Sequence, residues 1–250
     1  MENNNFEWLC RTELLVGREG IERLSNARVA VFGIGGVGGY VCEALARSGI
    51  GNIDLFDGDV ISLSNINRQI IALHSTVGRA KTDVMRERIL DINPLCCVRS
   101  NNIFYTLENA SLYSFNNYDY IIDAIDSVES KIELIVRAKS ENVPVISSMG
   151  TGNRLDTKSF SITDISKTAG CPLAKVMRRE LRLRSIFHLK VLASSDTPIK
   201  AENINKERHF IGSVAYVPSV AGLMIAGEVI RDLLVADNAN KEEQALNNLI

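Results

Sequence analysis

The chain has 250 residues, of which 46% are hydrophobic and 23% are charged, and its formal net charge is −2 at pH 7. The length allows one large α/β domain with a substantial core, and the composition is that of an ordinary globular protein. Such a near-neutral charge excludes a general attraction to nucleic acid, so binding of that kind would need a local basic patch.

The cysteines and one uncharged stretch indicate in which cellular compartment the protein is expected. Five cysteines form no C-x-x-C pair, and an odd number without a secretory signal predicts reduced thiols in a cytoplasmic protein. Residues 210–227 carry no charge, but Pro218 and several small residues interrupt them. We therefore expect a buried strand passing into a buried helix there, and no membrane span.

Helical and strand-like patterns alternate through the first 150 residues, beginning with helical spacing over 12–24. Strands are expected at 28–33, 52–57, 96–100, 119–124 and 144–148. Helices are expected at 37–48, at about 79–92, near 106–113 and at 128–141. This alternation predicts a parallel sheet with right-handed crossover connections.

From residue 150 onward the pattern changes. Strands are expected at 159–164, 187–192 and 213–217, helices at 172–184 and 219–234, and a polar, frayed tail from Asp237. We predict a single α/β domain over 1–250, Rossmann-like, with a mostly parallel sheet, helices on both faces and a C-terminal strand–helix extension. Its parts are a nucleotide-binding half at 1–150, a substrate and dimer half at 151–236, and the tail at 237–250.

A glycine motif follows the first strand. The apolar run Val29-Ala30-Val31-Phe32 leads directly into G-x-G-x-x-G, with glycines at Gly33, Gly35, Gly36 and Gly38. Glycines there let the backbone approach a phosphate, and the following helix offers N–H donors at its N-terminus. Asp57, at the end of the second strand, is placed to accept hydrogen bonds from a ribose. The motif alone also suits a tight turn without a ligand, and Asp57 also suits a strand-end cap.

Two cations and a second acid indicate a triphosphate. Arg68 lies in the long loop after the second strand, Lys81 near the start of the next helix, and Asp126 after the fourth strand. These positions converge on the carboxyl edge of one parallel sheet. Arg68 and Lys81 would neutralise phosphates, and Asp126 would hold Mg²⁺, as attack on an α-phosphate requires. A solvated Lys81 and an Asp126 that only caps a helix are the simpler alternatives.

Together these residues resemble the adenylating superfamily of the ThiF/HesA type, which is related to ubiquitin-activating enzymes. The resemblance covers about residues 11 to 235, and it implies that ATP activates a carboxylate. It also implies a homodimer in which Arg11 reaches the phosphates of the partner, with residues 212–235 in the interface. Asn67 and Gln69 would be neutral phosphate or loop-ordering donors, and Asp59 a structural or metal-side group. The motifs that carry the resemblance are Gly33-x-Gly35-Gly36-x-Gly38, Asp57-x-Asp59, Ser64-Asn65-x-Asn67-Arg68-Gln69, Gly78-x-x-Lys81 and Asp123-Ala124-Ile125-Asp126.

Within the superfamily, four segments are similar to the tRNA threonylcarbamoyladenosine dehydratase branch. That branch cyclises the carboxylate-bearing side chain of a modified adenosine next to the anticodon. The resemblance therefore implies ATP-dependent dehydration of tRNA through an acyl-adenylate. The segments are Asp123–Val128, Thr163–Thr168, Pro172–Arg178 and Ser194–Pro198.

A basic helix is the expected tRNA contact. Lys175, Arg178, Arg179 and Arg182 recur at helical spacing, and only Glu180 interrupts them. Such a concentration on a chain of net charge −2 is typical of a phosphate-backbone contact. A solvated helix with carboxylate partners of its own is the alternative.

Three other functions stay open from the sequence. The first is adenylation of a small sulfur-carrier protein that ends in glycine, although the paired zinc cysteines of many such enzymes are absent. The second is a nicotinamide-dependent oxidoreductase, which the cations Arg68 and Lys81 disfavour. The third is a nucleotide sensor without catalysis. No sulfur-transfer partner can be identified from the sequence.

Overall fold

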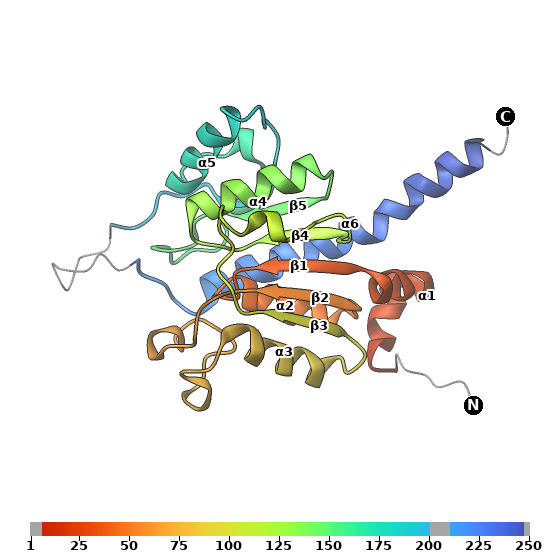
Figure 1. Cartoon of the computed structure of the whole chain (residues 1–250), viewed down its shortest axis with the longest axis horizontal. Helices are drawn as coiled ribbons and strands as arrows, with labels where there is room; N and C mark the ends of the chain where they lie inside the picture. The colour runs from red at the N-terminus through yellow and green to blue at the C-terminus, as the bar shows by residue number, and fades with distance from the viewer. Residues whose placement is uncertain (1–6, 201–210, 248–250) are drawn as a thin grey trace.

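The protein is described by a computed structural model of residues 7–200 and 211–247, with side chains up to Val235. Its centre is a seven-stranded sheet in the order β3-β2-β1-β4-β5-β7-β6 (Figure 1). All neighbouring strands are parallel except β6, which pairs antiparallel with β7 at one edge. The strands are β1 (Arg28–Phe32), β2 (Asn52–Phe56), β3 (Cys97–Asn101), β4 (Tyr120–Asp123), β5 (Val145–Ser148), β6 (Phe160–Asp164) and β7 (Lys190–Ser194).

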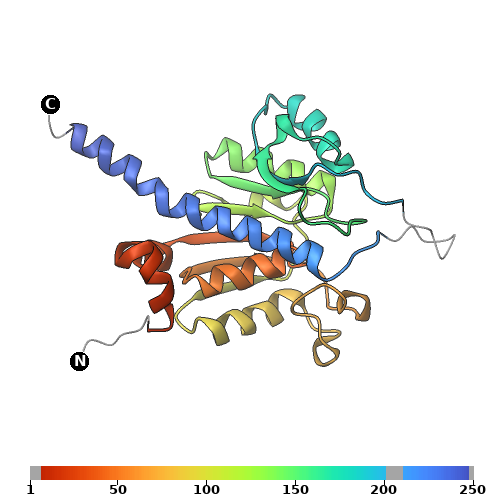
Figure 2. The same cartoon turned by 180° about the vertical axis from the view of Figure 1, so that it is seen from behind.

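Helices cover both faces of this sheet. One face carries α1 (Cys10–Asn26), α2 (Gly38–Arg47), α3 (Lys81–Ile92) and α6 (Tyr216–Asn247), as Figure 2 shows. The other carries α4 (Val128–Ser140) and α5 (Pro172–Arg182). Short 3-10 turns are η1 (Glu7–Leu9), η2 (Leu63–Asn65), η3 (His74–Thr76), η4 (Ala110–Leu112) and η5 (Ile165–Lys167). The predicted α/β fold with a mostly parallel sheet is confirmed.

Strand β1 divides the core in two. Val29 and Val31 pack into the cluster under α2 and α6, while Ala30 and Phe32 pack into the cluster under α4. All four are completely buried. A strand with both faces covered reads as a continuous apolar run, which is why this element was predictable.

The C-terminal elements differ most from the sequence prediction. The strand predicted at 213–217 is wrong, because α6 begins at Tyr216 and no strand precedes it in the described residues from 211. Pro218 fits the first turn of a helix, and packing against α2 outweighs the strand preference of the β-branched residues there. The helix also continues to Asn247, beyond the predicted end at 234, through a stretch rich in the helix formers Ala, Glu, Gln and Leu.

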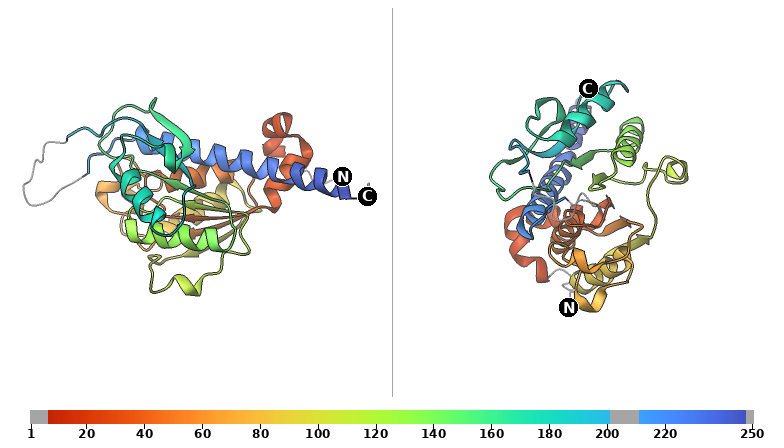
Figure 3. Two further views of the ribbon diagram at one scale, coloured as in Figure 1. Left: turned by 90° about the horizontal axis from the view of Figure 1, so that it is seen from above. Right: turned by 90° about the vertical axis from the view of Figure 1, so that its left-hand side faces the viewer.

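Two helices are shorter or less regular than predicted. The expected helix at 106–113 is only the turn η4. Helix α1 is interrupted at Gly17, whose φ of 73° is not helical. Its second half packs beside α6, where Arg23 Nη1 donates to the Leu234 carbonyl at 2.6 Å. Figure 3 shows α6 crossing the sheet and extending past it near α1.

The position of a ligand site follows from the strand order. From β1 the chain runs to β2 and β3 on one side, and from β4 to β5 on the other. Loops after β1 and β4 therefore diverge and leave a crevice at the carboxyl ends of these strands. Among the described residues, no helix combines the length and apolar character that crossing a membrane requires.

Candidate functional site

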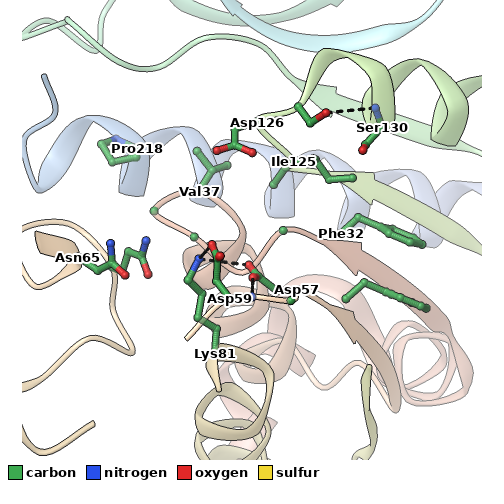
Figure 4. A pocket seen from close by; sticks show the side chains of 18 of the residues that line it. Phe32, Val37, Asp57, Asp59, Asn65, Lys81, Ile125, Asp126, Ser130 and Pro218 are labelled. Carbon is green, nitrogen blue, oxygen red and sulfur yellow. Dashed lines mark hydrogen bonds and ion pairs between the residues drawn. The ribbon is translucent and has the colours of Figure 1, made fainter. Parts of the chain in front are cut away.

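A cavity of about 420 Å³ opens at this crevice (Figure 4). Its walls come from the loops after β1, β2, β3, β4 and β5, from the first turns of α3 and α4, and from residues just before and within the first turn of α6. The volume lies within the range of small-ligand sites. Because each wall belongs to a different element, the fold itself determines which side chains meet there.

Two of the motif glycines are required by packing. Gly33 has a φ of +88°, and a Cβ on it would lie 2.5 Å from the Ala124 carbonyl oxygen. On Gly38, a Cβ would lie 1.8 Å from the carbonyl oxygen of Gly33. Gly38 does not line the cavity. Because Gly38 has no side chain, α2 can begin in close contact with the turn at Gly33, and this packing shapes the nucleotide site.

The other two motif glycines face the cavity. A Cβ on Gly35 would meet nothing closer than Gln69 Nε2 at 3.8 Å, and Gly36 has its nearest neighbour, Pro218, at 3.2 Å. The backbone N–H groups of Gly35, Gly36 and Val37 have no hydrogen-bond partner among the described residues. Free N–H donors before the N-terminus of α2 form an anion-binding turn.

Asp57 joins the loops after β1 and β2. Its Oδ2 accepts a hydrogen bond from the Ile34 N–H at 2.7 Å, and its Oδ1 accepts one from the Asp59 N–H at 2.9 Å. The carboxylate therefore holds the strand end in place beside the cavity. Its expected hydrogen bonds to a ribose remain a prediction.

Lys81 is held by two acids. Its Nζ is 2.6 Å from Asp59 Oδ2 and 3.6 Å from Asp57 Oδ2. The Lys81 side chain is only 7% exposed, whereas that of Asp59 is 53% exposed. Figure 4 shows these three side chains grouped together, with Asp126 on the other side of the cavity. Lys81 is thus a fixed cation of the cavity wall and not a solvated surface lysine.

The loop with Arg68 brings two polar groups to the cavity. The Arg68 guanidinium donates to the Ser64 carbonyl at 2.9 Å and to Asn67 Oδ1 at 2.8 Å, and no carboxylate pairs with it in the described chain. Gln69 is buried in the cavity wall, and its Oε1 lacks a hydrogen-bond partner among described residues. Asn67 does not line the cavity; its Nδ2 donates to the Ser213 carbonyl at 2.9 Å and ties the loop to the segment before α6.

Asp126 is the free acid of the site. It lines the cavity, is exposed, and has no ion-pair or hydrogen-bond partner in the described part of the chain. The described residues contain no cluster of three potential metal ligands. Mg²⁺ at a nucleotide usually takes one or two carboxylates together with phosphate oxygens and water. One free carboxylate beside an anion-binding turn therefore fits that ion.

The remaining predicted residues lie outside the cavity. Arg11 does not line the cavity: it belongs to α1, which lies at the end of the sheet where β1 begins (Figure 1), whereas the cavity lies at the carboxyl ends of the strands. On α5, Lys175, Arg179 and Arg182 are exposed. Arg178 instead donates to the Thr168 carbonyl at 2.8 Å and anchors η5. The basic face of α5 thus presents three of its four predicted cations.

Several wall residues were not singled out from the sequence. Asn65 lies inside the motif quoted for Arg68, so the motif itself was the available signal. Phe104 and Tyr105 follow β3, and their place at the carboxyl edge could have been inferred from the topology. Burial raises the pKa of the Tyr105 hydroxyl, so it stays neutral. Thr151 and Ser213 gave no signal, because tertiary packing alone brings them to the wall.

Fold and site define a nucleotide-binding α/β protein whose cavity, at the switch point of its sheet, is lined by free N–H donors and two cations. The sequence model of the ThiF family matches residues 9–250. The chain belongs to this family, which confirms the prediction from the motifs.

Relatives that match along nearly the whole length of both chains share one name. The tRNA threonylcarbamoyladenosine dehydratase of Bacillus subtilis (strain 168) is 45% identical over 237 residues, which cover 90% of this chain and 93% of that protein. The crystal structure of E. coli tRNA N6-threonylcarbamoyladenosine dehydratase, TcdA, in complex with ATP superimposes with a TM-score of 0.86 and 32% identity, over 94% of this chain and 96% of that chain. The complex of the same enzyme with AMP gives a TM-score of 0.85, over 92% and 94%.

Proposed function

We propose that the protein is an ATP-dependent enzyme that dehydrates threonylcarbamoyladenosine in tRNA to a cyclic form. The observation that carries the proposal is the cavity, in which free N–H donors, the fixed cation Lys81 and the unpaired Arg68 surround one site. Such an arrangement suits the transfer of an adenylyl group to a carboxylate. The identity of the substrate is inferred from the name of the Bacillus subtilis relative, which is similar to this chain along nearly its whole length.

In the first step the substrate carboxylate attacks the α-phosphate of ATP, giving an acyl-adenylate and pyrophosphate. Negative charge grows on the departing phosphate oxygens. Arg68 and Lys81, which line the cavity, would stabilise that charge, and the N–H groups of Gly35 and Gly36 would hold the phosphates. Asp57 would hold the ribose.

In the second step a nitrogen of the same side chain attacks the activated carbonyl carbon. The C–O bond to the phosphate breaks, AMP leaves with the electron pair, and the ring closes after loss of the nitrogen's proton. The net change is removal of one water. Because the attack is intramolecular, its effective molarity is on the order of 10⁵ M or more, so the protein needs no covalent intermediate of its own.

Magnesium is the expected cofactor. Asp126 would hold Mg²⁺ against the phosphates, where the ion would offset the charge that develops as pyrophosphate leaves. The unpaired state of its carboxylate supports this role.

The tRNA would lie along α5. Lys175, Arg179 and Arg182 are exposed on one helix, and Arg and Lys contacts to phosphates supply most of the affinity for a nucleic acid. In this proposal residues 1–150 bind the nucleotide and residues 151–236 bind tRNA and the partner subunit. An enzyme with this substrate would act in the cytoplasm.

A homodimer would complete the site. Leu14 and Leu15 on α1 are 86% and 88% exposed, next to Arg11 on the same helix. Exposed apolar side chains are typical of protein interfaces when they occur together. Tyr216 and Leu223 on α6 are also about half exposed. A second copy that covers these helices would bring its own Arg11 to the phosphates.

The deciding experiment uses the full chain, Mg-ATP and tRNA that carries threonylcarbamoyladenosine. After digestion of the RNA, the nucleoside should lose the mass of one water, and one AMP should appear for each nucleoside converted. The Lys81→Ala variant serves as a control for contaminating activity. If AMP forms only with another carboxylate, such as the C-terminus of a sulfur-carrier protein, the adenylating site is retained and the tRNA substrate is rejected.

A further inference from the structure

A buried ion pair lies directly under the loop between β4 and α4. Lys131 Nζ is 3.0 Å from Asp123 Oδ2, and both side chains have no exposed surface. Removing two charges from water costs free energy that their attraction often fails to offset, so apolar residues would stabilise the fold at least as well. The pair therefore needs an explanation other than stability.

Both partners are bonded to the backbone of that loop. The Lys131 ammonium donates to the Ile125 carbonyl at 3.0 Å, and the Ile125 N–H donates to Asp123 Oδ1 at 3.2 Å. From β5, the Ser147 hydroxyl donates to Asp123 Oδ2 at 2.6 Å and fixes the carboxylate. Both polar backbone groups of Ile125 are thus held by the pair, and Asp126 is the next residue.

The same loop supports the glycine turn. The Ala124 N–H donates to the Phe32 carbonyl at 2.8 Å, and the Ala124 carbonyl lies so close to Gly33 that a Cβ there would be 2.5 Å from its oxygen. Movement of the β4–α4 loop would therefore change the position of both phosphate-facing walls of the cavity.

We propose that Lys131 and Asp123 are a positioning pair that holds Asp126 and the β4–α4 loop where they meet the Mg²⁺-bound phosphates of ATP. Neither side chain lines the cavity, so both act through the loop. The inference rests on the ATP site of the proposed function but not on the tRNA substrate.

Two variants separate positioning from simple charge balance. Lys131→Met removes the ammonium and leaves Asp123 buried without a partner, so the fold should lose stability. The double variant Lys131→Met/Asp123→Asn makes the cluster neutral and keeps an acceptor for the Ile125 N–H and a partner for Ser147. In both variants the Ile125 carbonyl is left without its donor.

The measurement is the affinity of the full chain for ATP by calorimetry, with Mg²⁺ and with a chelator, together with the unfolding temperature. In Lys131→Met we expect a lower unfolding temperature and affinity for Mg-ATP reduced about 10-fold, as for loss of other groups that orient a metal ligand. The double variant should recover the unfolding temperature but not the affinity for Mg-ATP. ATP without Mg²⁺ should lose less affinity than Mg-ATP, because its binding does not use Asp126.

Recovery of Mg-ATP affinity in the double variant would overturn the proposal, because charge balance would then suffice. Arg88→Met is the matched control: Arg88 Nε lies 2.6 Å from Glu43 Oε2 in a partly buried pair that joins α3 to α2 away from the cavity. It should lower the unfolding temperature and leave Mg-ATP affinity unchanged. An equal loss of affinity in this control would also overturn the proposal.

The test of the positioning pair can fail independently of the proposed function. If the unaltered protein binds Mg-ATP but leaves the tRNA nucleoside unchanged, the proposed function fails while the positioning pair is still tested by binding. If the unaltered protein binds no Mg-ATP, both fail.

Discussion

The cavity and the exposed face of α5 both carry cations, but they hold them differently. Lys81 is nearly buried and paired with Asp59, and Arg68 is fixed by two oxygens of its own loop. On α5 the exposed cations have little to fix them, and the only acid among them, Glu180, pairs with Arg179 at 2.8 Å.

The difference separates two tasks. Fixed cations in a cavity stabilise charge that develops at one place, and they need no reorganisation during the reaction. Exposed, mobile cations attract a polyanion, and their contribution decreases as salt increases. The cavity should therefore determine the rate, and the face of α5 should determine affinity for tRNA.

The largest effect should come from removing a cavity cation. Lys81→Ala and Arg68→Ala should each lower the rate of AMP release by about 10²–10³, the usual loss for one preorganised donor to a developing charge. The affinity for tRNA should stay unchanged. Single-turnover assays with saturating ATP and tRNA measure the rate.

Arg79→Ala is the matched control for these variants. Arg79 is close in sequence, exposed, paired with Glu87 and outside the cavity. Its replacement should leave the rate nearly unaltered. Unchanged rates in both Lys81→Ala and Arg68→Ala would contradict the assignment of the site.

Two glycines of the motif differ in role, since Gly38 is needed for packing and Gly35 faces the ligand cavity. Gly38→Ala places a methyl group 1.8 Å from the Gly33 carbonyl, so it should cost about 1–3 kcal/mol of unfolding free energy. Gly35→Ala meets nothing within 3.8 Å, so it should unfold like the unaltered protein but bind ATP more weakly. Urea unfolding and calorimetry measure the two effects. Equal stability of both variants would mean that the turn is not packed as described.

Sequence patterns predicted the fold more completely than the site. Strands such as β1 and β4 are buried on both faces, so their apolar runs locate them within about a residue or two. The same reasoning gave the wrong element at 213–217, because Val214 and Val217 suit a strand, whereas α6 begins at Tyr216 and packs against α2.

For the site, the convergence of loops at one edge was predictable from topology alone. The partners within it were not. Lys131 meets Asp123 because the start of α4 packs beside the end of β4, and Asn67 bonds to Ser213 in the segment before α6. Neither contact leaves a local signal: the first depends on packing and side-chain rotamers, and the second joins residues 146 positions apart.

A smaller effect is expected on α5. The triple variant Lys175→Ala/Arg179→Ala/Arg182→Ala should weaken tRNA binding by about 10-fold at moderate salt. The slope of log affinity against log salt concentration should also become shallower, by about one for each phosphate contact that is lost. The rate at saturating tRNA should not change. Filter binding over a range of salt concentrations measures the slope, and an unaltered slope would assign the tRNA contact to another surface.

The smallest effect concerns α6, whose first turn lines the cavity. Glu228 on α6 is 2.7 Å from Lys190 Nζ on β7, and Arg231 also pairs with it. The hydrogen bond from Lys190, followed by that from Arg231, lowers the pKa of Glu228 below its usual value of 4.5. A lowered pKa in the folded state means that the folded protein keeps this carboxylate ionised where the unfolded chain binds a proton.

The stability from this carboxylate is therefore complete above about pH 4.5 and is lost as the pH falls through the lowered value. Glu228→Gln should cost about 1 kcal/mol of unfolding free energy at pH 7, a modest value because the cluster is partly exposed. The difference from the unaltered protein should disappear as the solution becomes more acidic than the lowered pKa. Urea unfolding at several pH values measures it, and a difference that stays constant into acid would mean that Glu228 stabilises α6 by packing and not by charge.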